Sequence, residues 1–397
     1  DAGSQPTITG NTFTGNTFPV KIYSRYIDNN LSGNTYSGNF AADNSSSDYI
    51  YVYGDGDDYR LSENKTYDWL KDGAPYRMMH NTHVWEDNDN NQVAILKIYP
   101  QVTLAFEPSK YLYIGSTASG DAGALQADGV TFTCVDSASA WAQIRMRTYS
   151  RDDLTLVENS IIERAVDGIY CATSNPTITN CTIRNNTDGI YADAGSQPTI
   201  TGNTFTGNTR PVSVYAARIN NTISGNTYTG NTKDYIEVQA ATLDENLTYV
   251  WAKDNGPYVV VGDVYVQRAN NGSQLSTLQI ASGTTVKFTS GADLFIGHES
   301  NGGYRGALTA TGVTFTSLDS TGWPGIDFRN YSEDAGCLLD SCTIENATDG
   351  IYCTSSNPTI TNCTIQNNTD GIEADAGSQP TITNCTIRNN TDGIYAD

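Results

Sequence analysis

Residues 175–201 read NPTITNCTIRNNTDGIYADAGSQPTIT, and this stretch decides the fold. Its apolar residues Ile178, Cys181, Ile183 and Ile190 lie in short segments in which apolar and polar side chains alternate. Alternation with a period of about two residues is typical of β-strands. It breaks between Ile178 and Cys181, so we expect the chain to turn at that point.

Asn180 lies at this predicted turn, and other copies of the line carry Gly10, Gly202, Asn362 or Asn384 in the same place. Asn and Gly adopt the left-handed backbone conformation at lower cost than other residues. We therefore predict positive φ angles at Asn180, Asn362 and Asn384. We also expect the side chains of these three asparagines to stack into a ladder.

Two further corners are predicted at residues 185–189 and 196–198, which gives three short strands in each coil. The line recurs with a period near 22, as the regular spacing of Cys342, Cys363 and Cys385 shows. Such a period fits a solenoid, because a single coil cannot bury its apolar side alone. The prediction is an all-β, triangular parallel β-helix with strands about 4.8 Å apart.

A longer repeat encloses the shorter one. The segment DAGSQPTITGNTFTGNT occurs at residues 1–17 and, without a change, at residues 193–209. We therefore divide the chain into a first unit at 1–192 and a second unit at 193–396, which has one extra coil. Asp397 is then the first residue of a further repeat phase.

Two stretches, residues 40–100 and 232–275, interrupt the short period and carry Trp69, Trp85 and Trp251. Insertions in solenoids emerge at corners. We therefore expect both stretches to protrude as loops or short hairpins from one side of the helix. Because binding residues concentrate on loops, these excursions are also the predicted place for a ligand or partner.

The line GI-x-x-x-x-x-NPTI-x-NCTI-x-NN resembles the right-handed parallel β-helix repeat of the pectin-lyase-like superfamily. The longer pattern at residues 278–328 is similar to modular repeats in secreted and cell-surface proteins of bacteria and archaea. The resemblance covers nearly the whole chain and implies a right-handed parallel β-helix. It does not imply one activity, because the superfamily contains lyases, hydrolases, epimerases, adhesins and passive surface proteins.

The charge balance narrows the classes of partner. The chain has 397 residues, with 22 Lys and Arg against 44 Asp and Glu, and a net charge of −22. This balance argues against a nucleic-acid partner, because phosphate contacts need clustered Lys and Arg. It also disfavours anionic sugars as substrates. No segment approaches the roughly 20 consecutive apolar residues that a membrane span requires.

The motif NTDG resembles a motif of the inverting polygalacturonases, in which an Asp works with a second acidic pair and with GHG and RIK elements. In this chain the Asp recurs once per coil, as Asp167, Asp188, Asp349, Asp370 and Asp392. A catalytic residue is needed once, whereas a corner residue is needed in every turn. No histidine lies in a GHG element; the histidines are His80, His83 and His298. We therefore predict no catalytic residue, and an Asp–Gly corner with side-chain hydrogen bonds and a positive-φ Gly.

Metal binding has two candidate segments. Asp87, Asp89 and Asn91 begin like a calcium loop, but the following Gly and the final Glu are missing, which favours a solvated acidic loop. His80 and His83 with Asp87 have the spacing of a transition-metal site, but the second unit has no matching ligands. We predict no metal site and no cofactor, with Ca²⁺ as the one candidate ion.

Six of the eight cysteines form inward-facing columns in the predicted coils. Cys181 shares one column with Cys342, Cys363 and Cys385, while Cys171 and Cys353 share another; Cys134 and Cys337 have no counterpart in the opposite unit. Neighbouring coils place such side chains close to disulfide distance. Buried free thiols and one or two bridges both fit the pattern, and the absence of a CxxC motif argues against zinc and thioredoxin chemistry.

Asn-x-Ser/Thr sequons are frequent, which would suit an exported glycoprotein. Asn and Thr are also the residues that β-helix corners and outer faces favour. The corner explanation covers Asn180, Asn362 and Asn384, whereas Asn64 and Asn246 are the better glycan candidates because they lie outside the regular coils.

The near-identical coils and recurring polar residues favour a non-catalytic structural protein of the cell surface, forming an extracellular rod, filament or surface-layer element. Asp1, Asp193 and Asp397 share one phase of the repeat. We therefore expect either a longer tandem array or copies of the chain stacked end to end, with surface glycans as further candidate ligands. Two alternatives stay open. One is a polysaccharide lyase or glycoside hydrolase, and the other is a carbohydrate-binding adhesin that stacks sugars on Tyr and Trp.

Overall fold

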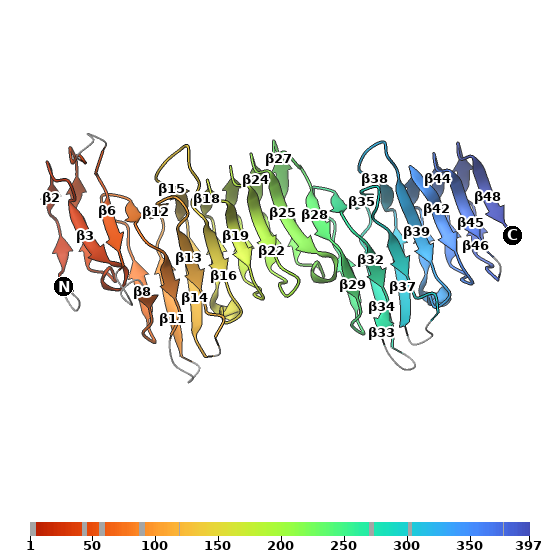
Figure 1. Ribbon diagram of the computed structural model, residues 1–397, viewed down its shortest axis with the longest axis horizontal. Coiled ribbons are helices and arrows are strands. Elements are labelled where there is room, and N and C mark those ends of the chain that lie inside the picture. Colours follow the sequence, from red (N-terminus) through yellow and green to blue (C-terminus); the bar gives the residue numbers. More distant parts are fainter. Residues whose placement is uncertain are drawn as a thin grey trace. The chain divides into compact units, whose positions relative to one another are not determined.

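The computed structural model describes residues 5–41, 46–54, 60–86, 92–118, 120–269, 274–300, 304–375 and 377–397. These residues form short strands joined by tight corners, and strands of successive coils pair in parallel (Figure 1). The chain divides into two compact units, residues 1–212 with 226–234 and residues 213–225 with 235–397. The repeat boundary at residues 192 and 193 concerns the sequence and stays a prediction.

Three parallel sheets build the first unit. The first sheet contains β7 (Arg60–Leu61), β10 (Thr82–Val84), β13 (Tyr111–Ile114), β16 (Gln143–Met146), β19 (Asp167–Cys171) and β22 (Asp188–Ala192). The second contains β8 (Thr66–Trp69), β11 (Val93–Ile98), β14 (Ala122–Asp128), β17 (Leu156–Glu158), β20 (Thr177–Thr179) and β23 (Thr199–Thr201). The third contains β3 (Val20–Tyr23), β6 (Ile50–Tyr53), β9 (Tyr76–Met78), β12 (Thr103–Phe106), β15 (Thr131–Cys134), β18 (Ile161–Glu163), β21 (Thr182–Arg184), β24 (Thr204–Thr206) and β27 (Thr227–Thr229).

The second unit repeats this plan. Its first sheet contains β29 (Ala241–Leu243), β32 (Val264–Val266), β36 (Leu294–Ile296), β39 (Trp323–Phe328), β42 (Ala347–Cys353), β45 (Asp370–Ala374) and β48 (Asp392–Ala396). Its second contains β30 (Thr248–Trp251), β34 (Ser276–Ile280), β37 (Tyr304–Thr311), β40 (Leu338–Asp340), β43 (Thr359–Thr361) and β46 (Thr381–Thr383). Its third contains β28 (Ile236–Gln239), β31 (Tyr258–Val260), β35 (Thr285–Phe288), β38 (Thr314–Ser317), β41 (Thr343–Glu345), β44 (Thr364–Gln366) and β47 (Thr386–Arg388).

Two strands extend these sheets: β25 (Arg210–Tyr215) lies next to β22, and β26 (Ile223–Ser224) lies next to β23. The other strands are short, namely β1 (Ile8–Thr9), β2 (Thr12–Phe13), β4 (Leu31–Ser32), β5 (Thr35–Tyr36) and β33 (Arg268–Ala269). Single-turn 3₁₀ helices are η1 (Ser24–Tyr26), η3 (Asp152–Leu154), η4 (Ala216–Arg218) and η5 (Asp334–Gly336). Among the residues that the structure describes, no helix has the length and hydropathy to cross a bilayer.

The core consists of side chains that stack from coil to coil. Ile162, Ile183 and Phe205 are successive Cα partners in the third sheet of the first unit, and all three are fully buried. The polar neighbours of each strand point outward, as the alternation in the sequence predicts. Burial of each such side chain contributes about 1.5–3 kcal/mol, so the stacked columns are the main source of stability.

The predicted period holds in the regular coils and lengthens elsewhere. Ile162 has Ile183 as its Cα partner across a regular coil, whereas Tyr111 has Gln143 as its Cα partner across a much longer one. The prediction that residues 40–100 and 232–275 protrude is wrong for most of their described parts, which supply strands β6 to β11 and β28 to β32. The exception is β33, which leaves the parallel stack and pairs antiparallel with β37. Trp69 and Trp251 are 0% and 1% exposed inside these coils. The period is lost because the coils gain residues, not because the chain leaves the sheets.

The predicted left-handed corner is confirmed. Asn180, Asn362 and Asn384 have φ angles of 52°, 56° and 55°, and Gly202 has 67°. The second corner also turns through the left-handed region, at Asn185 with φ of 56°. Single residues of this kind reverse the chain without breaking the parallel register of the coils.

The predicted Asp–Gly corner is wrong. Asp188 is the first residue of β22, and Gly189 and Gly371 do not adopt positive φ. A Cβ at Gly189 would clash with the carbonyl oxygen of Pro211, and a Cβ at Gly371 would clash with that of Gly393. Gly is therefore required here because the backbone of the next coil passes too close for a side chain.

Candidate functional site

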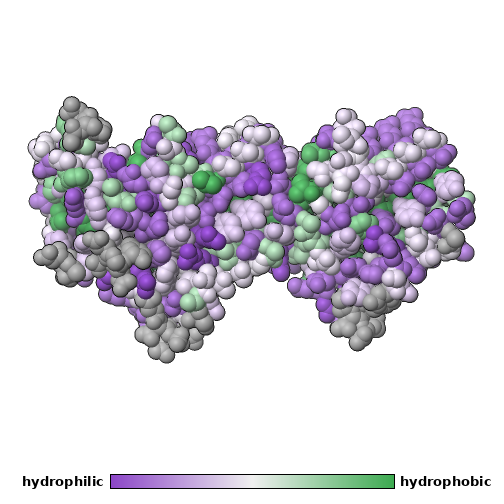
Figure 2. Space-filling model, in the orientation of Figure 1, coloured by the Kyte–Doolittle hydropathy of each residue, from purple (hydrophilic) through white to green (hydrophobic). Residues whose placement is uncertain are grey.

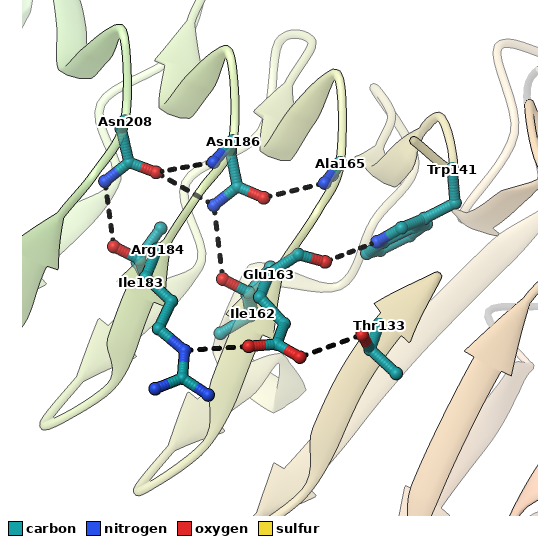
Figure 3. Close-up of polar contacts among 9 residues, drawn as sticks. All are labelled: Thr133, Trp141, Ile162, Glu163, Ala165, Ile183, Arg184, Asn186 and Asn208. Atoms are coloured by element: carbon teal, nitrogen blue, oxygen red, sulfur yellow. Dashed lines mark hydrogen bonds and ion pairs between the residues drawn. The ribbon is translucent and has the colours of Figure 1, made fainter. Parts of the chain in front are cut away.

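An asparagine ladder joins the coils at the second corner of the first unit (Figure 3). The side-chain oxygen of Asn208 accepts hydrogen bonds from the backbone N–H and the side-chain amide of Asn186, both at 3.0 Å. The Asn208 amide in turn donates to the carbonyl oxygen of Ile183 at 2.8 Å. Asn186 makes the same contacts one coil earlier, to the N–H of Ala165 at 2.8 Å and the carbonyl of Ile162 at 3.1 Å.

The ladder predicted at Asn180, Asn362 and Asn384 is wrong, because these three side chains are exposed. The residue after the left-handed position points inward instead. At the first corner Asn203, 1% exposed, accepts from the N–H of Cys181 at 2.9 Å and donates to the side chain of Asn226 at 3.1 Å. The prediction therefore had the right residue type and missed the position by one residue.

The cysteine column occupies this same ladder position. The Sγ atom of Cys363 donates to the carbonyl oxygen of Leu339 and accepts from the N–H of Cys342, both at 3.4 Å. All eight cysteines are free thiols. Burial raises the pKa of the Cys181 and Cys353 thiols to about 12, so these groups stay protonated and act as small core side chains with weak hydrogen bonds.

The recurring aspartates line the outer side of the first sheet in each unit. Asp167 and Asp188 are Cα partners at the start of β19 and β22. Arg210 contacts both carboxylate oxygens of Asp188, at 2.6 and 2.5 Å. Burial, together with the charge of Asp188, raises the pKa of Asp167 to about 6. Asp167 is therefore a carboxyl group that takes up a proton more readily than usual, beside a second carboxyl group that is ion-paired with Arg210.

In the second unit the outer side of the first sheet carries more acidic residues. Carboxylate oxygens of Asp349, Asp370 and Glu373 all lie within 4.8 Å of one another. Burial and the charge of Asp370 raise the pKa of Asp349, and burial with the charges of other aspartates raises that of Asp293 to about 6. Such oxygen sets can hold a hard cation such as Ca²⁺. The repeat in the sequence already stacks Asp349 and Asp370 as possible oxygen ligands, but it did not point to Glu373. The signal for Glu373 is its place three residues after Asp370.

We call this outer surface the acidic face and define it by Asp263, Asp293, Asp327, Asp349, Asp370 and Glu373. The equivalent surface of the first unit is the arginine face, defined by Arg60, His83, Trp85, Tyr113, Arg145, Arg147, Tyr170 and Tyr191. Most of these residues form one column of successive Cα partners, namely Arg60, His83, Tyr113, Arg145, Tyr170 and Tyr191. The sequence analysis found no cluster of cations, because the members are scattered along the chain from Arg60 to Tyr191.

Arginines and aromatic rings interleave on the arginine face. The guanidinium of Arg147 lies 3.8 Å from the ring centre of Tyr113, and that of Arg145 lies 4.7 Å from the ring centre of Tyr170. His83 lies between Trp85 and Tyr113, with ring centres 4.5 and 4.8 Å away. Burial, with the charges of Arg147 and Arg60, lowers the pKa of His83 to about 4, so this ring is neutral at pH 7.

The predicted metal segments have different outcomes. Asp87, Asp89 and Asn91 lie outside the described residues, so the calcium loop and the Asp87 ligand stay predictions. His83 is part of the arginine face, and His80 packs against Tyr53 with ring centres 6.0 Å apart. Of the glycan candidates, Asn64 and Asn246 are exposed, and their side-chain oxygens accept backbone N–H groups of the next coil at 3.2 and 3.1 Å.

The surface between these sites is polar. In the space-filling view, hydrophilic side chains cover most of the visible face of each unit, with small apolar patches between them (Figure 2). A cavity of about 660 Å³ lies in the first unit beside η3, lined among others by Lys97, Asp152 and Leu156. Acidic and basic side chains both line this cavity, and no cluster of aromatic rings does. The cavity therefore does not resemble a platform on which sugars stack.

Comparison with known proteins agrees with the architecture. The sequence profile of the family described as right handed beta helix region matches residues 123–277 and 295–397. Comparison with curated proteins and with solved structures gives no significant match. The profile covers more than half of the chain, and the parallel coils are those of a right-handed β-helix. The chain therefore belongs to the right-handed β-helix region family.

Proposed function

We propose that this chain is a non-catalytic structural protein of the cell surface, forming an extracellular rod, filament or surface-layer element. One observation carries the proposal: the polar side chains that recur in every coil are used to hold the next coil. Asn186, Asn203 and Asn208 each satisfy backbone groups of the neighbouring coil. Side chains that bond one coil to the next make a long and rigid β-helix. They are spread along the coils and do not gather in one place where a substrate could bind.

The same contacts favour copies of the chain as partners, stacked end to end. Each coil offers the next one a row of backbone groups and an inward ladder side chain, and residues 193–209 repeat residues 1–17 without a change. A further coil with this sequence would stack in register, whether it came from the same chain or from a copy. Such a contact joins unlike surfaces and produces a fibre if it does not close.

Electron microscopy of the purified chain, with sedimentation velocity over a range of concentrations, tests this proposal. We expect rods that lengthen as concentration rises. A sharp monomer peak at all concentrations, with no rods in the images, would contradict it. Glycan analysis and localisation in the source cell test the extracellular part independently.

A glycoside hydrolase or lyase is the second candidate, because Asp167 and Asp188 form an adjacent carboxyl pair in which the pKa of Asp167 is raised to about 6. Incubation with acidic polysaccharides and detection of new reducing or unsaturated ends tests this alternative. Asp167→Asn should abolish any such activity, whereas Asp349→Asn, the same change in the second unit, should leave it intact. Absence of cleavage over a broad polysaccharide set removes the alternative.

A further inference from the structure

We infer that the arginine face of one chain binds the acidic face of a second copy, so that chains associate side to side through two unlike surfaces. This inference rests on the proposed function, in which copies of the chain assemble, and adds a lateral contact to the end-to-end contact. Four observations lead to it.

The first observation is that two arginines of the arginine face form no ion pair within the described part of the chain. Arg145 and Arg147 pack on aromatic rings, and no carboxylate of a described residue lies within ion-pair distance of either guanidinium. The Nε–H of Arg145 is buried and has no hydrogen-bond acceptor among the described residues. Burial lowers the pKa of Arg147; Tyr113 raises it in part, and the charge of Arg145 lowers it. A nearby anion from outside the chain would relieve this repulsion.

The second observation comes from the equivalent arginine of the second unit. Arg329, in the segment FRNYS, corresponds to Arg147, in the segment MRTYS. It packs on the ring of Phe295, 3.6 Å from its centre. It also has two carboxylate partners, Asp327 at 2.9 Å and Glu299 at 3.3 Å.

Both partners are absent from the first unit. Arg145 stands at the position of Asp327, and Thr117 stands at that of Glu299. The first unit thus keeps the aromatic support for the guanidinium, loses both carboxylates and gains a second cation. A purely structural role for the arginine would favour keeping a carboxylate.

The third observation is that the acidic face carries an excess of negative charge. Asp349, Asp370 and Glu373 crowd their carboxylates within 4.8 Å of one another. Burial raises the pKa of Glu373, and the charges of neighbouring aspartates, Asp349 first among them, raise it further. The Oδ1 atom of Asp327 is buried and has no hydrogen-bond donor among the described residues. Cations brought by a partner would relieve this repulsion in turn.

The fourth observation is that the two faces match in spacing. They are built from equivalent strands of the two units, and neighbouring parallel strands lie about 4.8 Å apart in both. Rows of arginine on one chain can therefore meet rows of carboxylate on another in register. Aromatic rings flank the charges on both faces, with Tyr113 and Tyr170 on one and Phe295 and Tyr352 on the other. Charge complementarity of this kind selects the partner and its register.

Charge reversal tests the contact in the full chain. Arg145→Glu with Arg147→Glu makes the arginine face acidic, and Asp349→Lys with Asp370→Lys makes the acidic face basic. We expect the wild-type chain in low-salt buffer to form laterally associated species, heavier than single rods in sedimentation velocity, and each reversed variant to weaken that lateral association by about tenfold or more in apparent dissociation constant. An equimolar mixture of the two variants should restore it, because each reversed face then meets a complementary one.

Matched controls separate the contact from net charge and from folding. Lys71→Glu with Lys253→Glu changes the net charge as the first variant does, and Asp136→Lys with Asp319→Lys changes it as the second does. Both controls should associate like the wild type. Circular dichroism and thermal unfolding report whether each reversed variant is folded. If Arg145→Glu with Arg147→Glu unfolds, the milder Arg145→Gln with Arg147→Gln replaces it.

Four results would overturn the inference: a reversed variant that associates like the wild type, a mixture that stays dissociated, association that EDTA abolishes, or a monomeric wild type whose arginine face instead binds polygalacturonate. EDTA sensitivity would assign the acidic face to a cation, and polygalacturonate binding would assign the arginine face to an acidic sugar. Electron microscopy distinguishes this inference from the proposed function. Single rods without bundles in both reversed variants support both ideas, and bundles that persist in them overturn only the lateral contact. Absence of rods in every sample overturns the end-to-end proposal.

Discussion

The two units build the same inner corner with different side chains. Along the first corner, the first unit carries Ser160, Cys181 and Asn203, and at the corresponding places the second unit carries Cys342, Cys363 and Cys385. All of these positions satisfy the backbone of the neighbouring coil. Ser160 accepts from the N–H of Val130 at 3.1 Å, Asn203 from that of Cys181 at 2.9 Å, and Cys363 from that of Cys342 at 3.4 Å.

The comparison of these side chains shows which properties the inward position at the first corner requires. It requires a small side chain with an acceptor that reaches back one coil. Asn203 and Cys363 also donate to a carbonyl of that coil, whereas the hydroxyl of Ser160 donates to the carbonyl of Glu158 in its own coil. An amide accepts and donates with two strong groups, whereas a thiol does both with one weak group. Asparagine should therefore contribute more stability than cysteine at equivalent positions, and substitutions can measure the difference.

Loss of an amide from the ladder should have the largest effect. Asn203→Leu keeps the branched shape and the number of side-chain heavy atoms but removes the acceptor for Cys181 and the donor for the Ile178 carbonyl at 3.0 Å, leaving buried polar groups unsatisfied. We expect a loss of about 3–5 kcal/mol in the free energy of unfolding, measured by urea denaturation. Asn203→Cys, which imitates the neighbouring position, should lose clearly less. Equal losses for the two substitutions would show that the hydrogen bonds do not matter.

Substitution of the outer-face carboxyl group of Asp167 should have the next largest effect on the free energy of unfolding, and this effect should depend on pH. The pKa of Asp167 is raised from 3.8 to about 6 in the folded chain, first by burial and then by the charge of Asp188. Its stabilising contribution is present below about pH 3.8 and is lost as pH rises through about 6. The full shift corresponds to about 3 kcal/mol, which partial exposure reduces to about 1–2 kcal/mol.

Asp167→Asn should therefore stabilise the chain by about 1–2 kcal/mol at pH 7 and have little effect at pH 3.5. Thermal unfolding at both pH values measures this. Asp349→Asn is the matched change in the second unit, where the pKa is raised in the same direction, by burial and then by Asp370. Destabilisation by Asp167→Asn at pH 7 would mean that its charge is held by a favourable ion pair.

Removal of a thiol from the cysteine column should have a smaller effect. Cys363→Ala deletes a buried sulfur and its weak bonds to Leu339 and Cys342, and we expect a loss of about 1 kcal/mol in urea denaturation. Cys363→Asn installs in the cysteine column the kind of amide that Asn203 supplies in the ladder of the first unit, and it should restore or exceed the wild-type stability. A loss with Asn larger than that with Ala would mean that the cysteine column is too narrow for an amide.

The fold could be predicted from the sequence because each regular coil repeats the same pattern of apolar and turn residues. Alternating apolar residues at Ile178 and Ile183 and the left-handed Asn180 were enough to place the strands and the first corner. The ladder was misplaced by one residue, because the left-handed residue and its inward neighbour are both often Asn. The long coils were misread as loops, because the extra residues removed the period on which the prediction depended.

The candidate sites were harder to predict. The arginine face collects Arg60, His83 and Arg145 from three separate coils, and their irregular spacing along the chain carries no local motif. The register of the long coils, in which Tyr113 is the Cα partner of Arg145, brings these residues together. A sequence alone shows that register only if the coil length is already known. The acidic cluster lies in regular coils, so the short period could have shown it.

Asn180→Gly, at the left-handed corner, should change the free energy of unfolding least. The comparison with Asn203, a ladder residue that follows the left-handed position, then separates backbone conformation from side-chain bonding. Asn180 is exposed, has a φ of 52°, and corresponds to Gly202, whose φ is 67°. Asn180→Gly should change the free energy of unfolding by no more than about 0.5 kcal/mol, because the lower cost of the left-handed region offsets the greater freedom of the unfolded chain. Asn180→Ala should cost about 1–2 kcal/mol, since Ala adopts this region poorly. Urea denaturation of both variants beside Asn203→Leu measures backbone conformation and side-chain bonding separately. If Asn180→Gly were as damaging as Asn203→Leu, the exposed asparagine side chain would have to hold the coils together, and the inner ladder would not be their principal polar link.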